Sequence, residues 1–222
     1  MRKILRNNGL SIVLFLLFAV FLVGQTLTGW RDHNNELQEE GEAPLALSDY
    51  LVSGSFIEAT MENWESEFLQ MTAYVVLTVF LFQKGSAESK PPDGGPQPVD
   101  RDPRLSAHKK DVPAPVRHGG LQLRIYENSL GLALLVLFLL SFGLHAIGGC
   151  MDYNEELQRQ GKAQLTVLQY MGSARFWFES LQNWQSEFLS IWSMVVLSIF
   201  LRQRGSPESK PVDAPHSETG SG

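Results

Sequence analysis

The sequence contains little cysteine and little charge, and each shortage excludes a class of protein. Cys150 is the single cysteine among 222 residues, so an internal disulfide framework and a cysteine-rich metal site are both excluded. Charged residues make up 19% of the chain and the formal net charge is −6, which leaves no basic face for a nucleic acid. We therefore expect no nucleic-acid partner, while the redox compartment stays open.

Catalytic and cofactor-binding motifs are also missing. The chain has no phosphate-binding glycine loop, no zinc-ligand spacing and no nucleophile elbow. Its histidines are scattered at His33, His108, His118, His145 and His216. The sequence therefore predicts that the protein is not an enzyme, and it predicts no cofactor, catalytic or metal-ligating residue.

The apolar residues are gathered into four blocks. A bilayer core about 30 Å thick needs roughly 20 helical residues, and segments 9–29 and 129–149 meet that length. The other two blocks are shorter. They can cross the bilayer only if the helices extend over Trp64–Gln83 and Trp184–Gln203, with the helix ends in the headgroup region. The alternative is that the shorter blocks are buried helices of a soluble protein. The blocks are Leu10–Leu27, Phe68–Phe82, Leu130–Ile147 and Phe188–Leu201.

The chain is an internal duplication. Residues 8–93 align with residues 128–213 without a gap, and 36 of the 86 aligned pairs are identical. Because the copy of the first apolar block is internal, we expect that block to be a retained helix and not a cleaved signal peptide. The predicted fold is an all-α membrane protein, with four transmembrane helices arranged as two tandem helical hairpins of the same orientation.

The distribution of Lys and Arg predicts the topology. Eight of them lie between Lys84 and Arg124, three precede the first block and three lie in the tail, whereas the two outer loops hold one and three. The positive-inside rule therefore places both termini and the linker in the cytoplasm of a multi-pass protein of the inner (plasma) membrane. Each repeat has an even number of spans, so both hairpins face outward.

Composition divides the chain into four segments. We expect transmembrane hairpin repeats at 1–84 and 124–204, a cytoplasmic linker at 85–123 and a cytoplasmic tail at 205–222. The linker carries seven prolines among glycines and mixed charges, so we expect it and the tail to be disordered.

The outer part of each hairpin has a recognisable pattern. Gly41 and Gly161 follow polar stretches that continue the first helix of each hairpin, and both are predicted C-cap glycines. The mixed stretches 45–57 and 165–177 predict a short amphipathic helix at the outer interface.

Polar residues at membrane depth are the candidate functional groups. Glu67 and Glu187 are paired by the duplication, and the matched position on the facing helix is Gln25 in one copy and His145 in the other. We hypothesise a hydrogen bond between Gln25 and Glu67 and a carboxylate–imidazole pair between Glu187 and His145. Three interpretations of the glutamates stay open: they mark the wet headgroup zone, they make a structural hydrogen bond, or they serve a proton or ion pathway.

Tryptophans are placed to anchor the outer ends of the spans. Trp30, Trp64 and Trp184 fall where the apolar blocks meet polar sequence, as expected for an aromatic belt. Glycines in 9–29 and 129–149 allow close helix packing, although glycine is also common in membrane helices without such a role.

One string of residues resembles a known family. Asn63-Trp64-Glu65-Ser66-Glu67-Phe68-Leu69, which leads into the second span, is similar to a bacterial membrane-protein family classed as a domain of unknown function. The second copy departs from the pattern, with Gln182 and Gln185 replacing two acids and Cys150 replacing a tryptophan. The resemblance implies placement in a bacterial inner membrane and carries over no catalytic residue.

These observations favour a non-enzymatic scaffold or accessory protein of the membrane. Its partners are expected to be the lipid bilayer and either further copies of the chain or other membrane proteins. The first outer loop holds eight acidic residues and one Arg between Arg31 and Asn63, which suits cations or basic surfaces. The alternative is a small proton or cation transporter or channel that uses the intramembrane Glu and His residues.

Overall fold

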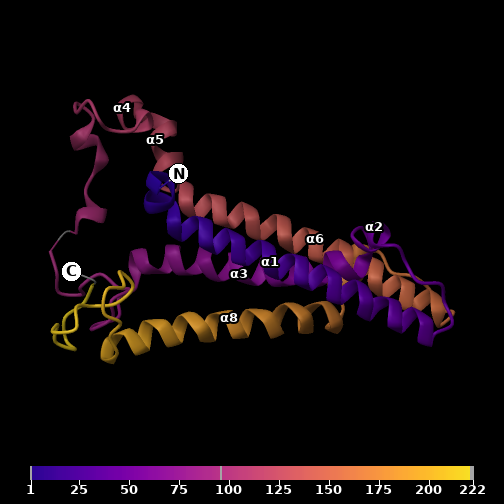
Figure 1. The fold of residues 1–222 in the computed structure, drawn as a ribbon. Coiled ribbons are helices and arrows are strands. Elements are labelled where there is room, and N and C mark those ends of the chain that lie inside the picture. Colours follow the sequence, from indigo (N-terminus) through magenta and orange to yellow (C-terminus); the bar gives the residue numbers. More distant parts are fainter. Residues whose placement is uncertain (1, 96, 221–222) are drawn as a thin grey trace. The chain divides into compact units, whose positions relative to one another are not determined.

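All regular elements are helical in the part of the chain that the computed structural model describes, residues 2–95 and 97–220 (Figure 1). The long helices are α1 (Arg2–Glu39), α3 (Gly54–Phe80), α6 (Ser129–Arg159) and α8 (Ala174–Phe200). The predicted all-α class is therefore confirmed. The short helices are α2 (Leu47–Tyr50), η1 (Pro98–Asp100), η2 (Pro103–Ser106), α4 (Ala114–His118), α5 (Gly120–Glu127) and α7 (Val167–Met171).

Within the described residues, α1 and α6 are the two helices long and apolar enough to cross a membrane. The most apolar stretch of α1 has none of its residues buried, and 22% of the corresponding stretch of α6 is buried. No stretch of α3 or α8 is apolar and uncharged over a sufficient length, because charged residues such as Glu65 and Glu187 continue into these helices. Two of the four predicted spans therefore have the composition of a transmembrane helix.

The predicted glycine caps end α1 and α6. Gly41 has a φ of +79° and Gly161 a φ of +67°, a left-handed conformation that glycine adopts without a steric penalty. In the first copy the Glu42 amide donates to the Leu37 carbonyl (2.7 Å), and the Gly41 amide donates to that of Gln38 (3.1 Å). This pair of bonds is a Schellman motif, and the second copy repeats it.

Helices α3 and α8 end three residues before the predicted limits at Gln83 and Gln203. The cause is a competing set of hydrogen bonds made by the Gly-Ser-x-Glu-Ser-Lys-Pro exits. The Gln83 amide donates to Ser89 Oγ (2.8 Å), and the Lys90 ammonium donates to the Val79 carbonyl (3.1 Å) that a longer helix would use. The Gln203 amide donates likewise to Ser209 Oγ (2.9 Å).

The amphipathic helix expected at the outer interface is shorter than predicted. α2 and α7 cover four and five residues, and the aromatic residues Phe56 and Phe176 belong to the first turns of α3 and α8. The division is made at Ser53 and Ser173, which lie between the short and long helices. Ser53 Oγ accepts a hydrogen bond from the Phe56 amide, and Ser173 Oγ accepts one from that of Phe176 (both 3.3 Å). These bonds satisfy donors that a new helix leaves unpaired.

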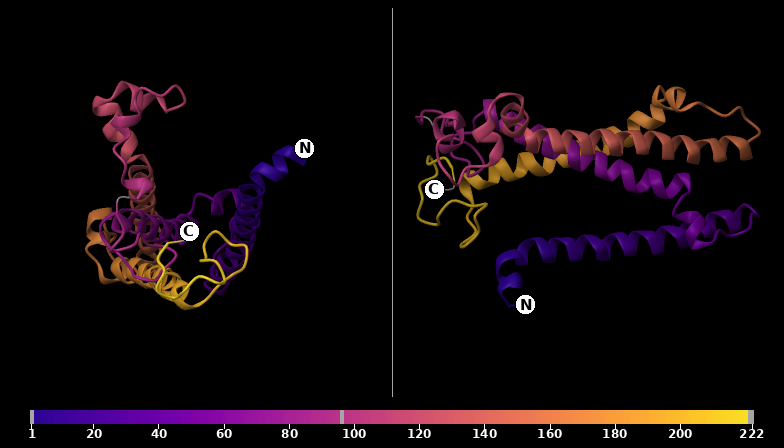
Figure 2. Two further views of the ribbon diagram at one scale, coloured as in Figure 1. Left: turned by 90° about the vertical axis from the view of Figure 1, so that its left-hand side faces the viewer. Right: turned by 90° about the horizontal axis from the view of Figure 1, so that it is seen from above.

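The chain falls into two units. The first comprises Met1–Glu62 and Gly143–Trp177, and the second comprises Asn63–Phe142 and Phe178–Gly222. The first unit thus holds α1, α2, α7 and the adjoining ends of α3, α6 and α8, and the loop that leads from α6 to α7 is clearest in the right-hand view of Figure 2. The second unit holds the rest of α3, α6 and α8 with the linker and the tail.

The linker carries local structure within the second unit. η1, η2 and α4 lie inside 85–123, and α5 crosses the expected boundary at residue 124. In η2, the Asp102 side chain accepts from the Arg104 amide, and proline occupies the first helical position. The expected disorder of this segment stays a prediction.

Candidate functional site

An asparagine closes the loop after α1 in the first unit. Asn34 Oδ1 accepts from the Leu45 amide (2.7 Å), and Asn34 Nδ2 donates to the Leu45 carbonyl (3.1 Å). The Trp30 indole donates to the same carbonyl (2.8 Å). Asn34 therefore satisfies both backbone groups of one loop residue, and Trp30 fixes their position from one turn earlier on the helix.

The second copy repeats this closure with one substitution. Asn154 Oδ1 accepts from the Leu165 amide (2.7 Å), and Asn154 Nδ2 donates to the Leu165 carbonyl (2.9 Å). Cys150, which stands where the first copy has Trp30, donates its thiol to that carbonyl at 3.5 Å. The matched asparagines thus have an architectural role, which the sequence alone did not reveal.

A tyrosine from each short helix packs against a glycine of the preceding long helix. Tyr50 and Tyr170 are almost fully buried. A Cβ atom at Gly29 would lie 2.4 Å from Tyr50 Oη, and one at Gly149 would lie 2.4 Å from Tyr170 Oη. Each pair occupies matched positions of the duplication, and the close approach of the tyrosine favours glycine at both.

Helices α3 and α6 approach each other at a pair of glycines in the first unit. A Cβ at Gly54 would lie 2.4 Å from the Asp152 backbone nitrogen and 2.8 Å from the Gly148 carbonyl oxygen. A Cβ at Gly148 would lie 2.7 Å from the Glu58 backbone nitrogen. The two backbones are therefore in direct contact, and the side chains one turn away on each helix are brought together.

Ionisable side chains of both helices lie at this crossing. A carboxylate oxygen of Glu58 lies within 4.8 Å of a ring nitrogen of His145. Glu58 is 9% exposed and His145 is fully buried. The Tyr170 hydroxyl reaches Glu58 Oε1 at 3.5 Å, and the His145 ring stacks on Phe176 at 4.9 Å. Glu58 and His145 thus form a buried acid–imidazole pair at the crossing of α3 and α6.

The charge of Asp152 is balanced by an arginine at the start of α8. Arg175 lies 3.6 Å from an Asp152 oxygen and 2.6 Å from one of Glu156, and its guanidinium sits over the Tyr153 ring at 4.7 Å. Asp152 lies beyond the expected span 129–149. Burial raises the pKa of its carboxyl group, and Arg175 opposes the rise.

The four polar residues predicted at membrane depth have different surroundings. Gln25 donates to Thr60 Oγ1 at 3.3 Å, and His145 belongs to the α3–α6 crossing. Glu67 is exposed, and Glu187 is half-buried and interacts electrostatically with it within the second unit. The hypothesised pairs would join residues of different units, so they stay predictions.

A carboxylate that the sequence analysis did not single out lies in the second unit. Glu65 is fully buried and accepts a hydrogen bond from the Trp184 indole at 3.1 Å. The Trp184 ring also packs against Phe138 and Phe142, at centroid distances of 6.3 and 6.4 Å. Trp184 therefore connects α3, α6 and α8 within this unit, and the belt positions of Trp30, Trp64 and Trp184 stay predictions.

Helical periodicity could have identified the missed acids. Glu58 and Glu65 are seven residues apart, which places them on one face of α3, and Gly54 lies on the same face. Neither acid is repeated by the duplication, because the second copy has Phe178 and Gln185 at their positions.

The tail is held against the first-copy exit in the second unit. Lys210 is 1% exposed, and its ammonium donates to the carbonyls of Gly85 (2.5 Å), Glu218 (2.8 Å), His216 (3.1 Å) and Pro215 (3.3 Å). Burial lowers the pKa of Lys210. The Gly85 amide donates in turn to Thr219 Oγ1 (2.8 Å).

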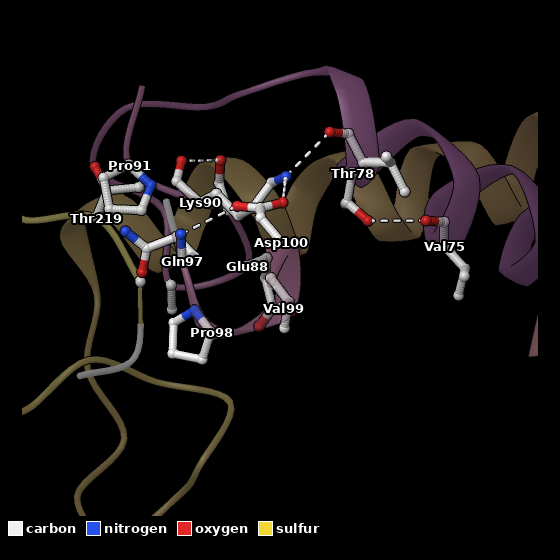
Figure 3. Close-up of a pocket in the computed structure, with 14 residues that line it drawn as sticks. Val75, Thr78, Glu88, Lys90, Pro91, Gln97, Pro98, Val99, Asp100 and Thr219 are labelled. Atoms are coloured by element: carbon white, nitrogen blue, oxygen red, sulfur yellow. Dashed lines mark hydrogen bonds and ion pairs between the residues drawn. The ribbon is translucent and has the colours of Figure 1, made fainter. Parts of the chain in front are cut away.

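A cavity of about 850 Å³ opens beside this exit (Figure 3). The end of α3 forms one wall with Val75, Thr78 and Val79, and the linker residues 97–100 form another. The Lys90 ammonium enters the cavity but is neutralised by Asp100 Oδ1 at 2.8 Å (Figure 3). The lining is thus mixed: besides this ion pair it holds the Glu88 carboxylate, which accepts a hydrogen bond from the Tyr74 hydroxyl at 2.9 Å.

The comparisons with known proteins give one match. Neither a curated protein nor a solved structure matches the chain. The model of a family described as a domain of unknown function (DUF6766) matches residues 1–221. That match confirms the expected relation to a family of unknown function, and it carries no information on membrane insertion, repeats or the motif. The chain belongs to the family described as Domain of unknown function (DUF6766).

Proposed function

We propose that this protein is a four-helix integral membrane protein that acts as a non-enzymatic scaffold or accessory protein. The observation that supports a scaffold is the repeated closure of both hairpins. Asn34 and Asn154 bind matched loop backbones, and Gly29 and Gly149 receive matched tyrosines. The residues that the duplication repeats in the outer loops are therefore engaged in holding two helical hairpins in one conformation.

The four-span arrangement has support in the surface of the helices. The apolar stretch of α1 has no buried residue, which is costly in water and favourable in lipid. Helices α3 and α8 are each 27 residues long, so each is long enough to cross a bilayer core of about 30 Å. Their charged residues would lie in the outer headgroup region, where a charge costs less than at the bilayer centre.

Cysteine labelling in intact cells tests this arrangement. In a Cys150→Ser background, single cysteines replace Ser48, which is exposed in α2, and His108, which is exposed in the linker. We expect an impermeant maleimide to label Ser48→Cys in intact cells, and His108→Cys only after permeabilisation. The reverse pattern would invert the topology, and labelling of both or neither in intact cells would refute four spans.

A second function, proton or cation transport, is favoured by the buried acids Glu58 and Glu65. Buried ionisable groups are costly in a membrane protein unless they serve a function or a bond. Proteoliposomes separate the two functions: a scaffold gives no proton or cation flux above empty vesicles. Flux that is abolished by Glu58→Gln with Glu65→Gln, or by Glu67→Gln with Glu187→Gln, would replace the scaffold by the transporter.

A further inference from the structure

A second cavity, of about 410 Å³, lies within the first unit and is lined by the C-terminal ends of α1 and α6 and by Arg175 at the start of α8. Its volume is in the range of small-molecule sites in proteins, roughly 300–1,000 Å³. Five carboxylate and two guanidinium groups line it, so its formal net charge is −3 with His33 counted as neutral. The cavity therefore suits a positively charged ligand. The carboxylates belong to Glu36, Glu39, Glu40, Asp152 and Glu156.

The two arginines join the walls of this cavity. Arg159 of α6 forms an ion pair with Glu40, which follows α1. Arg175 lies 2.6 Å from a carboxylate oxygen of Glu156 and 3.6 Å from one of Asp152, so it connects the start of α8 to α6. The ion pairs hold the lining together, and they leave most of its negative charge uncompensated.

A buried histidine of the lining has no hydrogen bond. His33 is 7% exposed, and its ring packs against Tyr50 at 5.7 Å. Its Nδ1 lies 3.9 Å from Glu36 Oε2, which is beyond hydrogen-bonding distance, and no described residue is hydrogen-bonded to the ring. Glu36 and Glu39 form no ion pair with a Lys or Arg side chain of the described residues. Because buried polar groups are normally hydrogen-bonded, a ligand with N–H groups would supply the missing partner.

The spacing of these groups suits a ligand larger than a metal ion. Among the described residues, no three His, Asp or Glu side chains of this cavity bring ligand atoms within 4.8 Å of one another. A metal ion held by three side chains needs that proximity, since its bonds are about 2.0–2.6 Å long. Carboxylates and the free nitrogen of a neutral imidazole accept hydrogen bonds. Their complement is a cation that carries several N–H donors along its length.

We propose that this cavity binds a small organic cation with several protonated amine groups, an oligoamine. Its ammonium groups donate to the carboxylates of Glu36 and Asp152 and to the ring of His33. A trication such as spermidine matches the formal charge of −3. Burial raises the pKa of Asp152, and a cation beside it offsets the cost of the buried charge. The ligand is additional to the proposed scaffold, and the cavity requires neither four spans nor a transport activity.

Calorimetric titration of the full-length protein in nonionic detergent with spermidine tests the site. We expect one spermidine per chain, and an affinity about 10-fold lower in each of His33→Phe, Glu36→Gln and Asp152→Asn. Asp152→Asn separates binding from folding, because asparagine removes a charge whose burial is unfavourable. Glu155→Gln in α6 and Asp49→Asn in α2 are matched controls, since they change exposed acids outside the lining. Neither control should alter the affinity.

A pair of ligands distinguishes N–H donors from charge alone. Hexamethylenediamine and hexamethonium are dications with the same carbon chain, but hexamethonium has methyl groups in place of the N–H groups. We expect the diamine to bind at least about 10-fold more tightly. Absence of spermidine binding by the wild type, equal affinity for the two dications, or unchanged affinity in Asp152→Asn would each overturn the proposal. Tighter binding of a tri-lysine peptide than of spermidine would also overturn it, and would assign the cavity to basic side chains of a partner protein.

Discussion

The two glycine–tyrosine contacts differ in one measurable respect. A Cβ at Gly29 would lie 2.4 Å from Tyr50 Oη but 3.4 Å from the next nearest atom, Cζ. A Cβ at Gly149 would lie 2.4 Å from Tyr170 Oη and also 2.8 and 2.9 Å from two ring carbons. The first contact is thus with a hydroxyl alone, whereas the second is with the whole edge of the ring.

Alanine at these glycines should destabilise the protein to different extents. Overpacking typically costs about 1–3 kcal/mol, and replacing a helical glycine by alanine contributes about 1 kcal/mol in the opposite direction. We expect Gly149→Ala to lower the free energy of unfolding by about 2 kcal/mol, since three atoms must move. We expect Gly29→Ala to lower it by about 1 kcal/mol or less, since only the hydroxyl must move.

Removal of the hydroxyl distinguishes the two sites. Gly29→Ala in a Tyr50→Phe background should be neutral or stabilising, because its nearest remaining contact is an ordinary 3.4 Å. Gly149→Ala in a Tyr170→Phe background should still destabilise by about 1 kcal/mol, because the ring carbons remain too close. Reversible unfolding in mixed micelles, followed by circular dichroism, gives these free energies.

Glycines without close neighbours provide the controls. No described atom beyond the local backbone would lie within 4 Å of a Cβ at Gly24 in α1 or at Gly143 in α6. Gly24→Ala and Gly143→Ala should therefore be harmless. If Gly149→Ala is no worse than Gly143→Ala, or if phenylalanine rescues both sites equally, the packing described here is wrong.

Three more predictions concern the loops and charges. Asn34→Ala should lower the free energy of unfolding by about 2–3 kcal/mol, since two hydrogen bonds to Leu45 are lost. Asn35→Ala, at an exposed position, should leave it unchanged. Chemical denaturation of the two variants measures both free energies. Burial raises the pKa of Asp152, so its contribution to stability is fully present below pH 3.8, the ordinary pKa of an aspartate, and is lost as pH rises through the pKa of the folded state. Asp152→Asn should therefore raise the free energy of unfolding at neutral pH and flatten its pH profile, and a decrease at pH 7 would contradict this expectation. Lys210→Met should release the tail, because buried carbonyls lose their donor. The rate of amide hydrogen exchange over residues 210–220 should rise more than about 10-fold. The matched variant Lys90→Met should leave that rate unchanged.

The sequence predicted those features that follow from local chemistry. The all-α class follows from long apolar blocks without breakers, and the ends of α1 and α6 follow from Gly41 and Gly161. The early ends of α3 and α8 were not predicted. They depend on Ser89 and Ser209, which lie six residues beyond the amides that they bind. Hydropathy alone does not describe such a competition for backbone groups.

The α3–α6 crossing could not be predicted because it depends on differences between the copies. Gly54 aligns with Ala174, and Gly148 aligns with Thr28, so a direct backbone contact fits the first-copy α3 and the second-copy α6. A Cβ at either glycine would meet backbone atoms at 2.4–2.9 Å. The opposite combination would bring Ala174 of α8 against Thr28 of α1, and these larger side chains would keep the two helices farther apart.

The buried acid–imidazole pair of Glu58 and His145 follows the same division between the copies. Glu58 of α3 aligns with Phe178 of α8, and His145 of α6 aligns with Gln25 of α1. A crossing of α8 with α1 would therefore hold neither an acid nor an imidazole at these positions. Asp152 has a duplicated counterpart in Asp32, but Asp32 is exposed. The asparagine closures and tyrosine contacts, by contrast, are present in both copies. Repeated residues therefore build the two hairpins, and the residues that differ create one buried acid–imidazole pair that two identical hairpins would lack.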